Sequence, residues 1–299
     1  MIITNKHKLP KQFVSFAEKQ LNETLHLDDK TYRVTSLLKG YKEAILLNRY
    51  RNDIVIDVSN LGWMLFGTAV HSVLRKNNED EREIKEFRVA KSFNIAGEEI
   101  SLIGHVDLYN EITNTLTDHK TCSVWKYIYR TYEEWSEQLA TYGMLLKDIG
   151  ILVEEGRCIA VFRDFNINKA KQSLNYPQQS MLEISFVFND EIFEQQEEII
   201  IKKLTKIREY EKLADDDIPE CTPEERWNYP TYAIIKKGNK TATRVFDKKI
   251  EAEMYYETMK KNTEYEIVKR DGKNKKCEYC FPKHFCNFYK NNVEEIKNE

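Results

Sequence analysis

The chain has 299 residues, of which 41% are hydrophobic and 32% are charged, and its formal net charge is −3. This length allows one sizeable hydrophobic core with a small appendage. No apolar run approaches the roughly 18 residues of a membrane span, and the first residues lack the apolar core of a signal peptide. We therefore expect a cytoplasmic protein that does not enter a membrane.

Helical and strand patterns alternate through the first two thirds of the chain. Helices are expected at residues 10–25, 34–50, 61–74, 132–147 and 191–213, and strands at 84–93, 100–109, 112–118, 158–165 and 181–188. The run Asp215-Asp216-Asp217-Ile218-Pro219 then ends the long polar helix and marks a boundary. We predict two domains, residues 1–214 and residues 215–299.

The second predicted domain contains a small β-β-α-β unit. Strands are expected at residues 232–236 and 242–246 around a hairpin turn, followed by a helix at 248–261 and a strand at 265–269. Residues 231–290 contain fifteen Lys or Arg and eight Asp or Glu, which is a local balance of +7. Such a basic module beside an acidic body would place phosphate contacts mainly on the module, although charge runs are often only solvated faces.

The most informative motif is Gly104-His105-Val106-Asp107, followed eleven residues after the aspartate by Asp118-His119-Lys120. The two strands that carry it are expected to meet at a turn, and a period of two places Asp118 and Lys120 on one face of a strand. Carboxylates and an ammonium at one edge of a hairpin are costly to bury unless they serve each other or a metal ion. Carboxylate oxygens suit Mg²⁺ or Mn²⁺. Taken alone, the pattern also fits the charged ends of an exposed hairpin.

Motifs before and after this hairpin favour the metal site over the exposed hairpin. The helix at 61–74 contains Gly67-Thr68-Ala69-Val70-His71, and the helix at 132–147 contains Gln138 and Tyr142, four residues apart on one face. Alone, His71 fits a core histidine and the other pair is unremarkable. The order G-T-A-V-H, G-H-V-D, D-H-K-T and Q-L-A-T-Y, however, resembles the RecB-like branch of the PD-(D/E)xK nuclease superfamily.

The resemblance implies an α/β restriction-endonuclease-like core, with a central mixed sheet flanked by helices. It implies a divalent metal site, with Mg²⁺ or Mn²⁺ as the ion, and a supporting motif close to DNA. The residues that carry this site over are His71, Asp107, Asp118 and Lys120, the backbone carbonyl of His119, the supporting Gln138 and Tyr142, and Glu86 as a weaker candidate for a second ion. The implied function is a metal-dependent DNA nuclease, favoured to be an exonuclease, in bacterial or phage recombination, replication or repair.

A second motif lies in the C-terminal tail. Cys277, Cys280 and Cys286 form a C-x2-C-x5-C pattern, a strong spacing for metal ligands. Cys221 is the best candidate for a fourth ligand, and His284 is the alternative. Four thiolates suit structural zinc or a [4Fe–4S] cluster.

The same nuclease branch includes iron–sulfur proteins with a similar C-terminal triplet. Their first cysteine usually precedes the nuclease core, whereas this chain has no cysteine before Cys122. The remaining two cysteines, Cys122 and Cys158, resemble small buried hydrophobic residues.

Two other classes of function fit parts of the sequence. A degenerate nuclease fold could act as a DNA-binding or assembly module with a zinc-stapled tail, and a zinc-bearing interaction protein would make the tail the functional element. Neither has a chemical need for the set of His71, Asp107, Asp118 and Lys120. The expected partners are DNA, as ends or single strands, and recombination or replication proteins. Cutting mode, strand polarity and oligomeric state remain open.

Overall fold

The computed structural model describes residues 1–25, 29–76, 82–259 and 261–294. These residues form two compact units. The first contains Met1–Lys39 and Arg51–Glu209, and the second contains Gly40–Tyr50 and Tyr210–Glu299. The second unit thus includes a segment from the N-terminal part of the chain, a long-range association that no local sequence pattern encodes.

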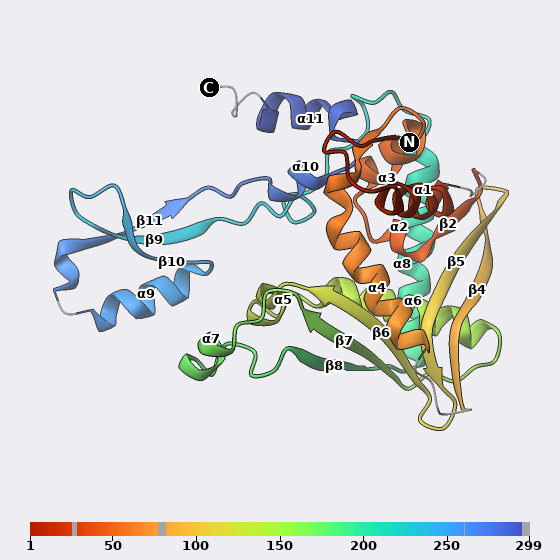
Figure 1. Cartoon of the computed structure of the whole chain (residues 1–299), viewed down its shortest axis with the longest axis horizontal. Coiled ribbons are helices and arrows are strands. Elements are labelled where there is room, and N and C mark those ends of the chain that lie inside the picture. Colours follow the sequence, from red (N-terminus) through yellow and green to blue (C-terminus); the bar gives the residue numbers. More distant parts are fainter. Residues whose placement is uncertain (26–28, 77–81, 260, 295–299) are drawn as a thin grey trace. The chain divides into compact units, whose positions relative to one another are not determined.

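A six-stranded mixed sheet lies at the centre of the first unit (Figure 1). Its strands are β2 (Thr31–Arg33), β4 (Glu83–Ile95), β5 (Glu98–Asn110), β6 (Thr115–Cys122), β7 (Glu155–Phe162) and β8 (Met181–Val187). The order is β2-β5-β6-β7-β8, and β4 pairs with β5. The β2–β5 and β6–β7 pairs are parallel and the others are antiparallel. A mixed sheet in an α/β fold, as the sequence predicts, is confirmed.

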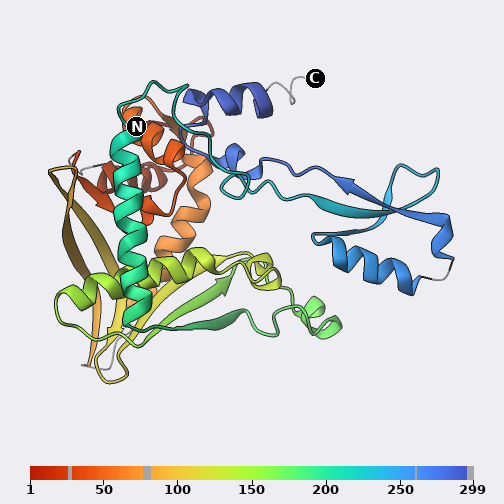
Figure 2. The same cartoon turned by 180° about the vertical axis from the view of Figure 1, so that it is seen from behind.

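Helices cover both faces of this sheet. The helices of the first unit are α1 (Lys11–Leu25), α2 (Val34–Leu37), α4 (Gly62–Lys76), α5 (Val124–Ile128), α6 (Glu133–Asp148), α7 (Ile167–Gln172) and α8 (Asp190–Tyr210). In Figures 1 and 2, α4 lies on one face, and α6 and α8 lie on the other. Beside the main sheet, β1 (Ile2–Thr4) pairs in parallel with β3 (Val55–Asp57), and a 3-10 turn, η1 (Val58–Leu61), leads into α4.

The core beneath α6 and α8 follows from the sequence pattern of β7 and α6. Every second residue of β7 is buried, from Gly156 to Phe162, as expected for a strand with one buried face. Gly156 is needed there because a Cβ atom at this position would lie 2.5 Å from Cε2 of Phe188. Cys158 is fully buried, as predicted, whereas Cys122 is only partly buried.

Among the boundaries that differ from the sequence prediction, two differ in a way that changes the local structure. β6 begins at Thr115 rather than Ile112, because the side chain of Asn110 accepts hydrogen bonds from the backbone N–H groups of Ile112 and Thr113 and so forms a wider turn. The predicted helix at 34–50 is two helices, α2 and α3 (Tyr41–Arg49), separated near Gly40. A Cβ atom at Gly40 would lie 2.8 Å from the Glu225 carboxylate, so a larger residue there would have to displace this side chain.

The second unit contains a small antiparallel sheet, α3 and the C-terminal tail. Its elements are α3, β9 (Thr231–Lys236), β10 (Ala242–Phe246), α9 (Lys249–Thr258), η2 (Asn262–Glu264), β11 (Tyr265–Arg270), α10 (Lys275–Tyr279), η3 (Lys283–Phe285), α11 (Asn287–Tyr289) and η4 (Lys290–Glu294). β9 lies between β10 and β11. The tail is tied to the end of α3, where the ring of Tyr50 stacks on Phe285 with centroids 4.1 Å apart.

Across residues 1–25, 29–76, 82–259 and 261–294, every helix is too short or too polar to cross a membrane.

Candidate functional site

The candidate site lies where β5 and β6 separate. The two strands pair only between Leu108–Asn110 of β5 and Thr115–Thr117 of β6, whereas β6 pairs with β7 along its whole length. Asp107 and Asp118 are the next residues in this register. The Asp107 carboxylate accepts a hydrogen bond from the backbone N–H of His119 at 2.9 Å, in the place that a strand partner would take.

The two faces of β6 carry different chemistry. Asp118 and Lys120 are two residues apart and lie on the side of α6, where both contact Gln138. His119 lies on the opposite side, where its ring is 5.8 Å from the ring of His71 on α4, in an edge-to-face arrangement. Because side chains alternate along β6, this one strand supplies Asp118 and Lys120 to the α6 side and His119 to the α4 side.

Two imidazoles and a carboxylate meet on the α4 side. Nδ1 of His71 lies 3.2 Å from Oδ2 of Asp107, and Nδ1 of His119 lies 3.5 Å from the same oxygen. One ligand atom from each of the three side chains lies within 4.8 Å of the others. The hydrogen bond to Asp107 raises the pKa of His71. Burial acts to raise the pKa of Asp107, but hydrogen bonds from His119 and His71 outweigh it and hold that pKa below its usual range.

A buried ion pair lies on the α6 side. The Asp118 side chain is 5% exposed, and its Oδ2 lies 2.8 Å from Nζ of Lys120. Burial raises the pKa of Asp118. For Lys120, burial acts to lower the pKa, but the attraction of the Asp118 carboxylate outweighs it and raises the pKa above the usual range. Both directions follow from one charged pair placed in a weakly solvated site.

Gln138 joins the polar groups on this side. Its Oε1 accepts a hydrogen bond from Nζ of Lys120 at 2.8 Å, and its Nε2 donates to Oδ1 of Asp118 and to the hydroxyl of Tyr142, both at 3.0 Å. Burial raises the pKa of Tyr142 to about 12, so this hydroxyl is neutral at physiological pH. One amide thus fixes the carboxylate, the ammonium and the phenol.

Gly104 explains the first position of the G-H-V-D motif. A Cβ atom there would lie 2.7 Å from Cε1 of Tyr142. The absence of a side chain on β5 therefore lets the Tyr142 ring lie against the strand and hold α6 close to it.

The structure brings together the side chains of His71, Asp107, Asp118, Lys120, Gln138 and Tyr142. Glu86, the weaker candidate, lies between the pairs Lys85–Leu108 and Phe87–Val106 of β4 and β5, across from Asp107; it is exposed, and its backbone is left-handed, with φ of 50°. The structure also adds the imidazole of His119, where the sequence predicts only a backbone carbonyl. Strand alternation was a usable signal for this, since it places residue 119 opposite Asp118 and Lys120.

The donor set fits a divalent ion. Asp107 and the two imidazoles are partly exposed, with side-chain exposures between 15% and 33%. On the buried side, Oδ2 of Asp118 makes no hydrogen bond within the described residues and has Lys120 as its ionic partner. Carboxylate oxygens with imidazole nitrogens suit Mn²⁺ and, through the carboxylates, Mg²⁺.

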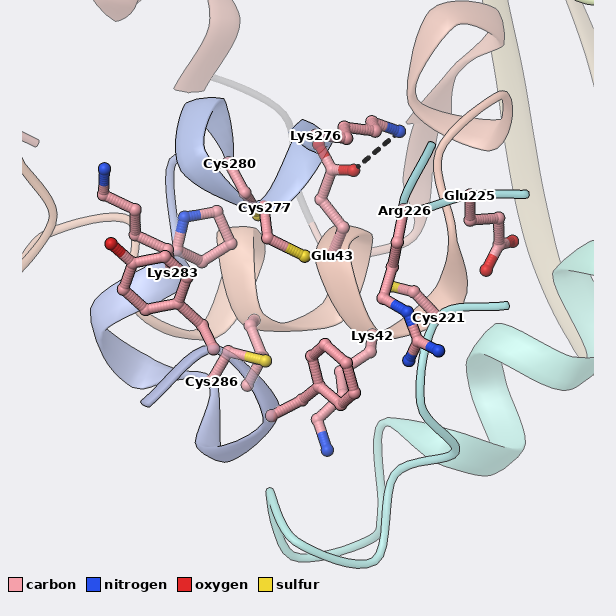
Figure 3. Close-up of a pocket in the computed structure, with 14 residues that line it drawn as sticks. Lys42, Glu43, Cys221, Glu225, Arg226, Lys276, Cys277, Cys280, Lys283 and Cys286 are labelled. Carbon is pink, nitrogen blue, oxygen red and sulfur yellow. Dashed lines mark ion pairs between the residues drawn. The ribbon is translucent and has the colours of Figure 1, made fainter. Parts of the chain in front are cut away.

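A second candidate site lies in the C-terminal unit. Figure 3 shows the cysteines 221, 277, 280 and 286 around one space, and together they line a cavity of about 30 Å³. A cavity of this kind needs roughly 10–15 Å³ to hold one water molecule. The residues that line it include all four predicted cysteines and do not include His284.

Charged side chains surround the cysteines. Lys42, Arg226, Lys276 and Lys283 line the cavity, together with the carboxylates of Glu43 and Glu225. Nζ of Lys276 pairs with Glu43 at 3.1 Å, which is the dashed line in Figure 3.

Burial favours the neutral form of three of the four thiols. Burial raises the pKa of Cys221 to about 11 and also raises the pKa values of Cys277 and Cys280. A metal that binds here would have to displace the thiol protons.

Comparisons with known proteins give distant structural similarity. No family model matches the sequence, and no curated protein matches it. Among solved structures, SSO0001 has 17% identity and a TM-score of 0.46, covering 64% of this chain and 86% of its own. An alkaline exonuclease from Laribacter hongkongensis has 12% identity and a TM-score of 0.40, covering 65% and 94%.

A phage-related exonuclease from Haemophilus somnus has 10% identity and a TM-score of 0.30, covering 66% of this chain and 79% of its own. All of these identities and TM-scores are low. The function is therefore inferred from the chemistry of the site itself.

Proposed function

We propose that this protein is a divalent-metal-dependent deoxyribonuclease of the RecB-like branch of the PD-(D/E)xK superfamily. The observation that best supports it is the meeting of Asp107, Asp118 and Lys120 where β5 and β6 separate, with His71 supplied by α4. A structural hairpin has no need for a buried carboxylate, a partly buried ammonium and two imidazoles within one site.

Asp107, His71 and the imidazole of His119 would hold the ion, with Asp118 as the carboxylate on the buried side. A bound ion supplies a Lewis acid for the phosphate and lowers the pKa of a water molecule. Lys120 places a fixed positive charge where negative charge develops on the phosphate. Gln138 positions both Lys120 and Asp118 through its hydrogen bonds.

DNA degradation with added ions tests this function. Linear end-labelled DNA should be cut with Mg²⁺ or Mn²⁺ and not with EDTA. Asp107→Asn and Asp118→Asn should each lower the rate by about 10³-fold or more, since each removes a charge that acts at the reaction centre. Asp148→Asn is the matched control, because Asp148 pairs with Lys91 away from the site. Full activity of either site variant would contradict the assignment.

The mode of cutting is proposed to be exonucleolytic, on ends or single strands of DNA in bacterial or phage recombination, replication or repair. Covalently closed circular DNA should then resist while the linear form is degraded. If the protein binds DNA but no ion supports cleavage of either form, the alternative applies, which is a DNA-binding module with a degenerate site.

We further propose that the four-cysteine cavity holds a metal centre, with a [4Fe–4S] cluster favoured over zinc. The four thiols line one cavity, and four thiolates suit either group. Four thiolates with either group carry net negative charge, which the surrounding Lys and Arg side chains would offset. All six cysteines are free, and this suits a reducing cytosol.

Anaerobic purification of the protein distinguishes a [4Fe–4S] cluster from zinc. A brown protein that absorbs broadly near 400 nm and contains iron supports the cluster. A colourless protein that contains zinc supports a zinc site. Cys221→Ser should lose the group and Cys122→Ser should keep it. Retention by Cys221→Ser would contradict the ligand set.

A further inference from the structure

Two pairs of aromatic side chains are exposed on the first unit. Trp63 and Phe66, on α4, are 61% and 37% exposed, and their ring centroids are 6.3 Å apart. Trp125 and Tyr129, in and just after α5, are 51% and 47% exposed and stack with centroids 5.4 Å apart. Single exposed aromatic residues are ordinary, whereas contiguous exposed apolar groups often mark a surface that contacts another molecule.

The adjacent residues Arg163 and Asp164 link the two pairs. The Arg163 guanidinium lies 4.5 Å from the centre of the Trp63 ring. The Asp164 carboxylate accepts hydrogen bonds from the Ser123 hydroxyl at 2.6 Å and from the Val124 N–H at 2.8 Å, at the start of α5. One dipeptide after β7 therefore contacts α4 on one side and α5 on the other.

The same two elements are continuous with the metal-type site. Trp63 precedes His71 by eight residues on α4, which corresponds to roughly 12 Å along a helix axis. Trp125 follows Lys120 by five residues, directly beyond the end of β6. At roughly 3.4 Å per stacked nucleotide, 12 Å is the length of three or four nucleotides. These rings therefore lie within the reach of a strand whose phosphate occupies the site.

We propose that Trp63, Phe66, Trp125, Tyr129 and Arg163 form a strand-binding surface on which the unpaired bases of a DNA strand stack. This deepens the proposed nuclease function, on which it rests. Aromatic faces stack on any base without sequence preference, and arginine adds a cation beside both rings and phosphates. Paired bases inside a duplex offer no free face, so the surface selects an unpaired strand.

Binding measured without cleavage tests this surface. The full-length protein in EDTA is titrated against dye-labelled oligodeoxythymidine, and against an abasic strand of the same length and charge. The wild type should bind the thymidine strand more tightly. Trp63→Leu and Trp125→Leu should each weaken that binding by about 10-fold, whereas Trp63→Phe should retain most of it because a ring remains.

A matched control is available on α1. Phe13 is 38% exposed, close to the 37% of Phe66, and lies on a helix outside the surface. Phe66→Leu should weaken binding of the thymidine strand, and Phe13→Leu should not.

The binding measurements test the strand-binding surface independently of whether the protein cuts DNA. Equal binding of the abasic and thymidine strands, or unchanged binding by both tryptophan variants, would overturn the strand-binding surface even if the wild type cuts DNA. A preference for thymidine that the variants lose supports the surface even if no cleavage is found. Tighter binding of duplex than of single strands, with no loss in the variants, would also refute it.

Discussion

The ion pair of Asp118 and Lys120 gives a prediction about stability that differs from the one expected for two neighbouring carboxylates. Two nearby carboxylates repel, so the sequence suggests that removing one leaves the metal-free protein unchanged or more stable. The structure instead places Asp118 against Lys120 at 2.8 Å, with only 5% of the aspartate side chain exposed. Removing the lysine would leave a buried carboxylate with Gln138 as its hydrogen-bond partner.

The expected magnitude follows from that burial. Breaking a buried ion pair by removing one partner costs about 3–5 kcal/mol. The Lys120 side chain is 24% exposed, so partial solvation places Lys120→Met at the lower limit, about 3 kcal/mol. With a urea dependence of roughly 2–3 kcal/mol per molar, the unfolding midpoint should fall by about 1 M.

The double variant Asp118→Leu with Lys120→Met isolates the pair. It buries no unpaired charge, and its main cost is the loss of two hydrogen bonds to Gln138, about 2 kcal/mol in all. The two single changes should cost about 6 kcal/mol in sum. Urea unfolding is followed by tryptophan fluorescence in EDTA, because a bound ion would add its own stabilisation.

Additive effects of the two single substitutions on the free energy of unfolding would refute the proposed role of this ion pair. If Lys120→Met unfolds at the wild-type urea concentration, or if the double variant loses the full sum, the ammonium does not compensate a buried charge. Lys120 would then act only on the substrate.

The remaining site predictions concern the imidazoles and Gly104. Activity should be higher with Mn²⁺ than with Mg²⁺, and His71→Ala should shrink this ratio, because an imidazole suits Mn²⁺ better; an unchanged ratio would return His71 to a packing role. His119→Ala should weaken Mn²⁺ binding by about 10-fold or more, measured by calorimetry, if its imidazole is a ligand and not only its backbone carbonyl. Gly104→Ala should destabilise the protein by about 1–3 kcal/mol in urea unfolding, because the new methyl group would displace Tyr142.

Local periodicity explains which features of the fold the sequence could predict. β6 places Asp118 and Lys120 on one face because side chains alternate along a strand, and α6 places Gln138 and Tyr142 on one face because they are four residues apart. Both relations are local, and the structure reproduces them. The strands of the first unit were predicted from local patterns in the same way, whereas their assembly into a mixed sheet was implied by the family resemblance.

Features that depend on tertiary placement were not accessible from the sequence. Strand alternation places His119 on the face opposite Asp118 and Lys120, but its contact with Asp107 also requires that α4 cover that face and that β5 separate from β6. Glu86 takes a left-handed backbone conformation that the strand pattern does not reveal. The placement of α3 in the second unit likewise depends on distant contacts, such as the hydrogen bond from Lys42 to the carbonyl of Ile218.

The last prediction concerns the cysteine cavity as a structural closure of the second unit. Cys221 and Cys277 are 56 residues apart in the sequence, and the small sheet lies between them. If both bind one metal centre, that centre closes a loop whose entropy is worth about 4 kcal/mol by the relation for disulfides. Loss of the metal centre would raise the population of the opened form of the second unit by about 10³-fold.

Limited proteolysis measures this opening directly. Cys221→Ser should be cut near residues 215–219 much faster than the wild type, whereas Cys122→Ser, whose thiol lies outside the cavity, should resist as the wild type does. DNA binding should weaken before cleavage chemistry is lost, because the ligands of the nuclease site are in the first unit. Equal proteolysis of the two variants, or equal metal content in both, would show that these thiols do not close the unit.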